Sequence, residues 1–189
     1  MKILFIRHAE TQINVEGLMH KTGEPVGLTD FGKKQAESLV SACLEHKVEY
    51  VFSSPEERST ETAKIISKGV NKEVEILATL IERNWGDWEG QAWPDIEKHI
   101  DKMNLEERYN FVPPKGESWS QMEARLRAAL AYITKKNYKV VAIITHEGAL
   151  RGFMPILLNL PKEESFKYHF ENAEVKFFEF INGVFTETI

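Results

Sequence analysis

The stretch Ile3-Leu4-Phe5-Ile6-Arg7-His8-Ala9-Glu10 determines how this chain begins to fold. Its first four residues are apolar and rich in strand formers, which predicts a short strand buried on both faces of a sheet. An arginine and a histidine follow this strand directly. Ligands of open α/β sheets bind at the carboxyl ends of the strands, so we expect Arg7 and His8 to lie at a binding site.

Strands and helices alternate along the rest of the chain. Short apolar runs predict further strands at 50–52, 74–81, 140–144 and a closing hairpin at 175–186, and helical spacing of apolar residues predicts helices at 29–44, 122–132 and 148–158. This order is typical of a three-layer α/β/α sandwich with a mainly parallel central sheet and an antiparallel edge. We expect a single domain over 1–189, with a helical insert or lid at about 91–117.

Local signals indicate where some of these elements begin and end. Thr29 is a plausible N-cap, and Ser54-Pro55-Glu56-Glu57 has the pattern of a capping box with proline at the first helical position. Pro155 is expected to kink the helix at 148–158 or to end it early. Cys43 falls on the apolar face of its helix, so we interpret it as core packing.

Composition excludes several classes of function. A formal net charge of −5 argues against a general affinity for nucleic acid or an anionic membrane, because such binding needs a surplus of lysine and arginine. A single cysteine forms neither an internal disulfide nor a zinc knuckle, so a reducing cytoplasm is the expected compartment. No apolar run approaches the length of a membrane span, and the N-terminus resembles mature structure rather than a signal peptide.

Polar residues follow four of the predicted strands. These residues are Arg7-His8-Ala9-Glu10, Ser53-Ser54 with Arg58, Glu82-Arg83 and Thr145-His146. Any one of them alone is more often a solvated or structural side chain, but agreement between four strand ends favours a site. Guanidinium groups bind a phosphate dianion in bidentate fashion, a neutral histidine is a competent nucleophile toward phosphorus, and a nearby carboxyl group could protonate the departing alkoxide.

The same residues resemble the signature of the histidine phosphatase superfamily, the phosphoglycerate mutase-like proteins. The matching blocks are Arg7 to Thr11, Asn14, Leu28-Thr29 with Gly32, Ser53 to Pro55 with Arg58-Ser59, Glu82 to Gly90, Gly116 to Ser118 with Arg125, and Thr145-His146 with Gly148. The resemblance implies a phosphoglycerate mutase-like fold and a phosphohistidine on His8. It further implies a phosphate pocket of Arg7, Arg58 and His146 with a contact from Asn14, Glu82 as proton donor, and neither metal nor cofactor.

Other residues receive weaker assignments. Lys21, Thr22 and Glu147 occupy positions that shape substrate choice in relatives, and the Glu147 carboxylate is expected to disfavour a second anionic group nearby. We expect Glu10 to have a structural role and the tryptophans Trp85, Trp88 and Trp93 to serve in packing. The remaining histidines are expected to be surface or core residues, namely His20, His46, His99 and His169.

The predicted activity is that of a histidine acid phosphatase-type phosphoric monoester hydrolase. Its partner would be a small phosphorylated metabolite, and the protein would be a monomer or homodimer. A cofactor-dependent phosphoglycerate mutase is the alternative, disfavoured because the insert contains only scattered Lys98, Lys102 and Arg108 instead of a paired cationic site. A non-catalytic phosphate-binding module is a second alternative, but it would predict loss of His8 or Glu82.

Overall fold

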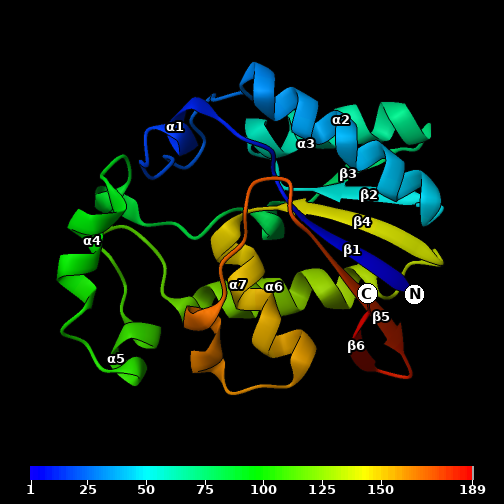
Figure 1. Ribbon diagram of the computed structural model, residues 1–189. Coiled ribbons are helices and arrows are strands. Elements are labelled where there is room, and N and C mark those ends of the chain that lie inside the picture. Colours follow the sequence, from blue (N-terminus) through cyan, green and yellow to red (C-terminus); the bar gives the residue numbers. More distant parts are fainter. Residues whose placement is uncertain (189) are drawn as a thin grey trace.

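The computed structural model describes residues 1–188 of the chain (Figure 1). Its strands are β1 Lys2–Arg7, β2 Tyr50–Ser53, β3 Val74–Ile76, β4 Val140–Thr145, β5 Val175–Ile181 and β6 Val184–Thr188. Its α-helices are α1 Gln12–Val15, α2 Asp30–Glu45, α3 Glu57–Val70, α4 Trp93–Ile100, α5 Leu105–Asn110, α6 Trp119–Ile133 and α7 Glu147–Leu158. Short 3-10 turns are η1 Ala78–Leu80, η2 Gly86–Trp88 and η3 Lys162–Lys167.

The strands form one six-stranded sheet in the order β3-β2-β4-β1-β5-β6. The four strands from β3 to β1 are parallel, whereas β5 runs antiparallel to β1, and β6 runs antiparallel to β5. The β1–β4 register pairs Arg7 with Thr145, so the residues after these two strands emerge side by side. The mainly parallel sheet with an antiparallel edge is confirmed.

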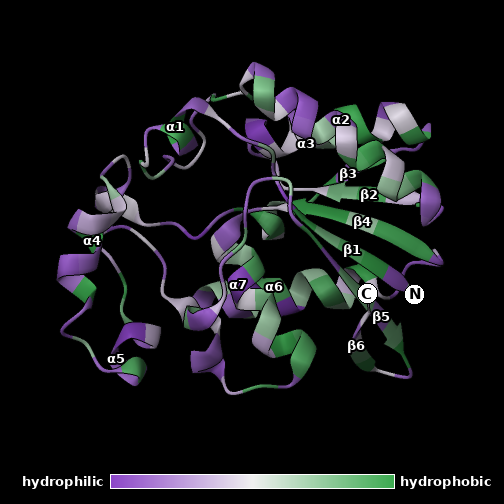
Figure 2. Cartoon of the chain, viewed as in Figure 1, coloured by the Kyte–Doolittle hydropathy of each residue, from purple (hydrophilic) through white to green (hydrophobic). Residues whose placement is uncertain are grey.

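Alternate residues of β1 bury opposite faces of the sheet. Ile3 and Phe5 pack into the cluster that includes residues of α6 and α7, whereas Leu4 and Ile6 pack with residues of α2 and α3. Helices therefore cover both faces, and the strands between them carry hydrophobic residues almost throughout (Figures 1 and 2). This arrangement confirms the three-layer α/β/α sandwich, because only a strand buried on both sides needs a continuous apolar run.

One predicted helix start is wrong, and one predicted early end does not occur. Helix α3 begins at Glu57 with Glu56 as N-cap and no side-chain cap, because the Ser54 hydroxyl lies 2.8 Å from Nε2 of His146 instead. Helix α7 continues through Pro155 to Leu158, so the proline does not end it early. The Thr29 cap is confirmed, since its side chain accepts a hydrogen bond from the N–H of Gly32.

The other differences lie at the edges of the fold. The third strand stops at Ile76 instead of residue 81, because only three of its residues pair with β2 and η1 then turns the chain toward the site. The closing hairpin is confirmed, with Asn182 and Gly183 both at positive φ as a two-residue turn requires. Within residues 1–188 no helix is both long enough and apolar enough to cross a membrane.

The insert at 91–117 contains α4 and α5, which lie beyond the end of the sheet (Figure 1). Ile96 and Ile100 of α4 bury themselves against Trp85, with Trp88 and Trp93 packed alongside. The structural interpretation of the tryptophans is therefore confirmed, although Trp85 and Trp93 also line the cavity described below.

Candidate active site

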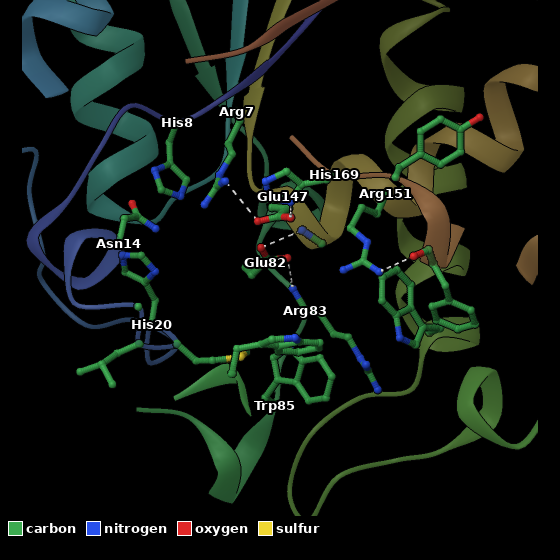
Figure 3. Close-up of a pocket in the computed structure, with 18 of the residues that line it drawn as sticks. Arg7, His8, Asn14, His20, Glu82, Arg83, Trp85, Glu147, Arg151 and His169 are labelled. Atoms are coloured by element: carbon green, nitrogen blue, oxygen red, sulfur yellow. Dashed lines mark hydrogen bonds and ion pairs between the residues drawn. The ribbon is translucent and has the colours of Figure 1, made fainter. Parts of the chain in front are cut away.

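A cavity of about 580 Å³ lies at the carboxyl ends of the parallel strands. Its lining includes seven of the residues proposed from the sequence, namely Arg7, His8, Asn14, Thr22, Arg58, Glu82 and Glu147. In Figure 3, His8, Asn14 and His20 occupy one side, Arg151 the opposite side, and Glu82 and Glu147 the region between them. Lys21 is not part of the lining, and His146 lies behind His8 with the ring centroids 5.2 Å apart.

His8 is held as a neutral imidazole with one free nitrogen. It follows β1, is 3% exposed, and its Nδ1 lies 2.8 Å from the carbonyl oxygen of Ala9. A carbonyl only accepts, so Nδ1 carries the proton and Nε2 carries the lone pair. Burial lowers the pKa of His8 well below 6.5, and the charges of Arg58 and His146 lower it further. Near neutral pH the Nε2 atom is therefore available as a nucleophile.

Arg7 and Arg58 bring hydrogen-bond donors that the protein leaves unused. Nε of Arg7 and both Nε and Nη1 of Arg58 are buried without a hydrogen-bond partner. The remaining bonds hold each guanidinium in place. Nη2 of Arg58 lies 3.0 Å from Glu56, and Nη1 of Arg7 donates to the carbonyl of Phe170 and lies 3.1 Å from Glu147. Buried donors of this kind are rare in folded proteins and indicate that a ligand supplies the missing acceptors.

His146 and Glu56 form a buried pair beside His8. Nε2 of His146 lies 2.8 Å from the Glu56 carboxylate, and its Nδ1 is buried without a partner. Burial and Arg58 lower the pKa of His146, while Glu56 opposes that shift. Burial raises the pKa of Glu56, but its contacts with His146 and Arg58 outweigh this and hold the pKa well below its usual range. Glu56 therefore stays ionised and fixes both neighbours.

Glu82 reaches the cavity from the segment after η1 and binds the start of α7. Its carboxylate accepts hydrogen bonds from the backbone N–H groups of Arg83 at 2.7 Å, Gly148 at 2.9 Å and Ala149 at 3.1 Å. A Cβ atom on residue 148 would collide with this carboxylate. Gly148 thus allows the helix terminus to approach Glu82 closely, which fixes the carboxylate at the cavity.

The loop after β1 supplies polar groups from the opposite side. Oδ1 of Asn14 accepts from the backbone N–H of Thr11, which caps α1. Nε2 of His20 lies 2.8 Å from the Thr11 hydroxyl, and its ring stands edge-on to His8 at 5.6 Å. Burial, together with nearby Arg58, lowers the pKa of His20 to about 3. Thr22 donates two hydrogen bonds to Glu89, at 2.7 and 2.6 Å, and so closes this loop.

Some cavity residues were not expected from the sequence. His20 and His169 line the cavity, although His169 is also exposed, as its assignment to the surface predicts. His20 immediately precedes the proposed specificity residue Lys21, which was the available signal, whereas nothing in the sequence pointed to His169. Glu10 is absent from the lining, and its carboxylate accepts from the Thr29 hydroxyl, as a structural role requires.

The insert contributes one of its three expected cations to the cavity, because Arg108 lines it and Lys98 and Lys102 do not. Arg83 and Arg151, which lie outside the insert, line the same cavity. The cations of the insert alone therefore do not reveal this grouping. As for metals, no cluster of three or more His, Cys, Asp or Glu side chains that could hold an ion occurs among the described residues.

Comparison with known proteins agrees with this geometry. Residues 3–188 match a family model described as "Histidine phosphatase superfamily (branch 1)". "Phosphoserine phosphatase 1" of Hydrogenobacter thermophilus is 27% identical over 92% of this chain and 83% of its own length. A "2,3-bisphosphoglycerate-dependent phosphoglycerate mutase" of Thermoplasma acidophilum is 27% identical over 93% of this chain and 86% of its own length. The crystal structure of an α-ribazole phosphatase from Shigella flexneri superposes with a TM-score of 0.86 at 25% identity, covering 100% of this chain and 95% of that one.

Proposed function

The chain belongs to the histidine phosphatase superfamily, and from this premise we propose that it is a metal-independent phosphomonoesterase. It acts on a small phosphorylated metabolite through a phosphohistidine intermediate on His8. The phosphatases among its relatives support hydrolysis as the reaction. The finer assignment as a histidine acid phosphatase-type enzyme stays a prediction, which a pH–rate profile tests.

One observation carries this proposal. Arg7 and Arg58 beside His8 have three buried guanidinium nitrogen atoms without a hydrogen-bond partner, and Nδ1 of His146 becomes a fourth donor when its imidazole is protonated. A phosphate dianion offers several strong acceptor oxygens and two negative charges, which suits these donors in both number and sign. The neutral Nε2 of His8 is the nucleophile that such a pocket would hold against the phosphorus atom.

The chemistry proceeds in two displacements. Nε2 of His8 attacks phosphorus, the bond from phosphorus to the ester oxygen breaks, and the departing oxygen takes a proton from the carboxyl group of Glu82. Water then attacks the phosphohistidine, Glu82 takes a proton from that water, and the nitrogen–phosphorus bond breaks to release inorganic phosphate. The guanidinium groups of Arg7 and Arg58 stabilise the charge on the three equatorial oxygens in both steps.

A mutase is the second candidate, because a relative of similar identity carries that name. In that reaction a hydroxyl of a bound phosphoglycerate, instead of water, would take the phosphoryl group from His8. The two candidates share every residue discussed above and differ only in the acceptor. Substrate assays therefore decide between them.

The test is release of phosphate from a panel of phosphomonoesters in the presence of EDTA, with the variants His8→Ala and Glu82→Gln alongside. The panel includes phosphoserine, α-ribazole phosphate, sugar phosphates and 3-phosphoglycerate with 2,3-bisphosphoglycerate. We expect hydrolysis that survives EDTA, disappears in His8→Ala and falls strongly in Glu82→Gln. Loss of activity with EDTA, or retention in His8→Ala, would refute the proposal, and interconversion of phosphoglycerates without hydrolysis would establish the mutase.

A further inference from the structure

Glu56 is a buried carboxylate at the phosphate pocket that the reaction described above does not use. It is the N-cap of α3, is 6% exposed and lines the cavity. Its Oε2 atom lies 3.0 Å from Nη2 of Arg58 and 2.8 Å from Nε2 of His146, and it accepts from the backbone N–H of Glu82 at 3.1 Å. One oxygen atom therefore connects Arg58, His146 and the segment of the proposed proton donor.

The contact with Glu56 determines which nitrogen of His146 carries the proton. The Glu56 carboxylate is ionised near neutral pH and therefore only accepts hydrogen bonds. A distance of 2.8 Å between Nε2 and a carboxylate oxygen requires a proton between them, and that proton belongs to Nε2. The Ser54 hydroxyl, also 2.8 Å from Nε2, cannot supply this proton, because the Nε2 lone pair would then face the carboxylate.

The other nitrogen of His146 then has a lone pair as long as the imidazole is neutral. Burial lowers the pKa of His146 and Arg58 lowers it further, whereas Glu56 and Glu82 oppose the shift. Nδ1 is buried without a hydrogen-bond partner, and the ring lies beside that of His8 at 5.2 Å. The remaining charged or titratable groups around His146 are Arg7, His8, His20 and Glu147.

The two arginines of the pocket already have negative partners. Arg7 lies 3.1 Å from Glu147, and Arg58 lies 3.0 Å from Glu56. A phosphate dianion therefore enters a pocket in which the guanidinium charges are balanced, and it brings two further negative charges. It also places an acceptor oxygen next to the Nδ1 lone pair, which is itself an acceptor. A proton at Nδ1 of His146 resolves both conflicts, because it turns the lone pair into a charged donor.

We propose, on the basis of the proposed function, that Glu56 is a positioning residue that couples phosphate binding to proton uptake by His146. Glu56 holds the first proton of His146 at Nε2 and stabilises the imidazolium that forms when the phosphoryl group binds. The second proton comes from the solvent, binds to the lone pair of Nδ1 and is donated in a hydrogen bond to a phosphoryl oxygen. It returns to the solvent when inorganic phosphate leaves.

Nuclear magnetic resonance of protein labelled with ¹⁵N-histidine tests the proposal directly, with sulfate as the probe. Sulfate is a tetrahedral dianion that does not titrate between pH 6 and 9, and its binding requires no turnover. The ¹⁵N chemical shifts distinguish a ring nitrogen with a proton from one with a lone pair, and the His146→Gln variant assigns the signals. At pH 7.5 we expect His146 to have only Nε2 protonated in the free protein and both nitrogens protonated in the sulfate complex.

Calorimetry across the same pH range measures the coupling as an affinity. In the wild type the dissociation constant of sulfate should rise about tenfold per pH unit between pH 7 and 9, as uptake of one proton requires. In Glu56→Gln it should change by about twofold or less per pH unit, because a neutral amide stabilises an imidazolium less and can itself donate to Nε2. Glu56→Asp, which keeps the charge, should retain part of the pH dependence.

Glu57→Gln is the matched control for these variants. Glu57 is the next residue in the chain, is exposed and does not line the cavity. Its substitution removes the same charge from the same turn of α3, so the pH dependence of sulfate binding and the protonation of His146 should both stay as in the wild type.

Two results would overturn the proposal. A sulfate complex in which Nδ1 of His146 still has a lone pair would show that no proton is taken up there, even if the affinity depends on pH through His8 or Glu82. An unchanged pH dependence and a fully protonated His146 in the sulfate complex of Glu56→Gln would show that Glu56 only packs in the pocket.

Failure of the proposed function gives a different result. If the wild-type protein hydrolyses no phosphomonoester, the proposed function is refuted, and the protonation of His146 in the sulfate complex is measured all the same. Absence of sulfate and phosphate binding at every pH would refute the pocket on which both proposals rest.

Discussion

Replacement of Gly148 by alanine is the sharpest perturbation that the structure offers for Glu82. Residue 148 lies in the first turn of α7, and an added Cβ atom would overlap Oε1 of Glu82 and lie 3.1 Å from its carboxyl carbon. The backbone of residue 148 has no positive φ, so alanine adopts its conformation without strain. Only the Glu82 carboxylate has to move.

The size of the effect follows from that displacement. A shift of about 1 Å in a reacting group costs roughly 100-fold in rate, and general acid catalysis as a whole contributes about 100- to 10,000-fold. We therefore expect kcat/KM for an alkyl phosphate to fall about 100-fold. Alanine is a better helix former than glycine by up to about 1 kcal/mol, so the free energy of unfolding should stay within about 1 kcal/mol of the wild-type value.

The assay compares two leaving groups. Glycerol 3-phosphate expels an alkoxide that needs a proton, whereas p-nitrophenyl phosphate expels a stable phenolate that does not. In Gly148→Ala the value of kcat/KM should fall for the first substrate and stay within about threefold for the second. Gly152→Ala on the same helix is the control, because its Cβ would meet only the flexible ends of Leu126 and Met122. An equal loss for both substrates, or no loss for either, would refute the role assigned to Glu82.

Three further predictions follow from the site and the core. Arg58→Lys removes the planar fork, so the inhibition constant of inorganic phosphate should rise about 10- to 100-fold in a competition assay, and an unchanged constant would argue against Arg58 as a phosphate ligand. The pKa of His20 is about 3 in the folded protein and near 6.5 when unfolded, so its stabilising contribution is present above pH 6.5 and is lost as the pH falls. Urea titrations at pH 7.5 and 5.0 should therefore show a loss of unfolding free energy that is smaller in His20→Gln by about 1–2 kcal/mol, and an identical loss in both proteins would contradict this. Burial raises the pKa of the Cys43 thiol to about 11, so iodoacetamide at pH 8 should leave folded protein unmodified and active, whereas rapid inactivation would contradict its assignment to the core.

The sequence predicts the central fold because its clearest pattern, the apolar runs, marks the residues whose burial contributes most to the stability of the fold. The apolar runs of β1 and β4 are buried on both faces, and such runs have few alternatives to a central strand. Local signals were less reliable where tertiary contacts compete for the same groups. Serine is a common N-cap residue, yet the hydroxyl of Ser54 contacts His146 instead of capping α3. His146 lies far away in the sequence, so no local pattern predicts that contact.

The sequence predicts only those residues of the site that the ends of the strands position. Arg7 ends β1 and His146 follows β4, and these strands are paired, so the proximity of the two residues follows from the sheet alone. Arg108 and Arg151 lie on helices outside the sheet, and their meeting at one cavity depends on how the insert packs. Neither periodicity nor spacing records such packing, which is why only the three-dimensional structure shows these arginines at one cavity.

The most direct test of the account is a search for the covalent intermediate on His8. Rapid acid-free quenching of the enzyme with a ³²P-labelled substrate, followed by peptide mapping, should place the label on the peptide that contains His8. The linkage should be stable to alkali and labile to acid, and the label should be absent from the His8→Ala variant. Label on any other residue, or turnover with no labelled peptide in a quench fast enough to capture it, would contradict the central claim that His8 receives the phosphoryl group.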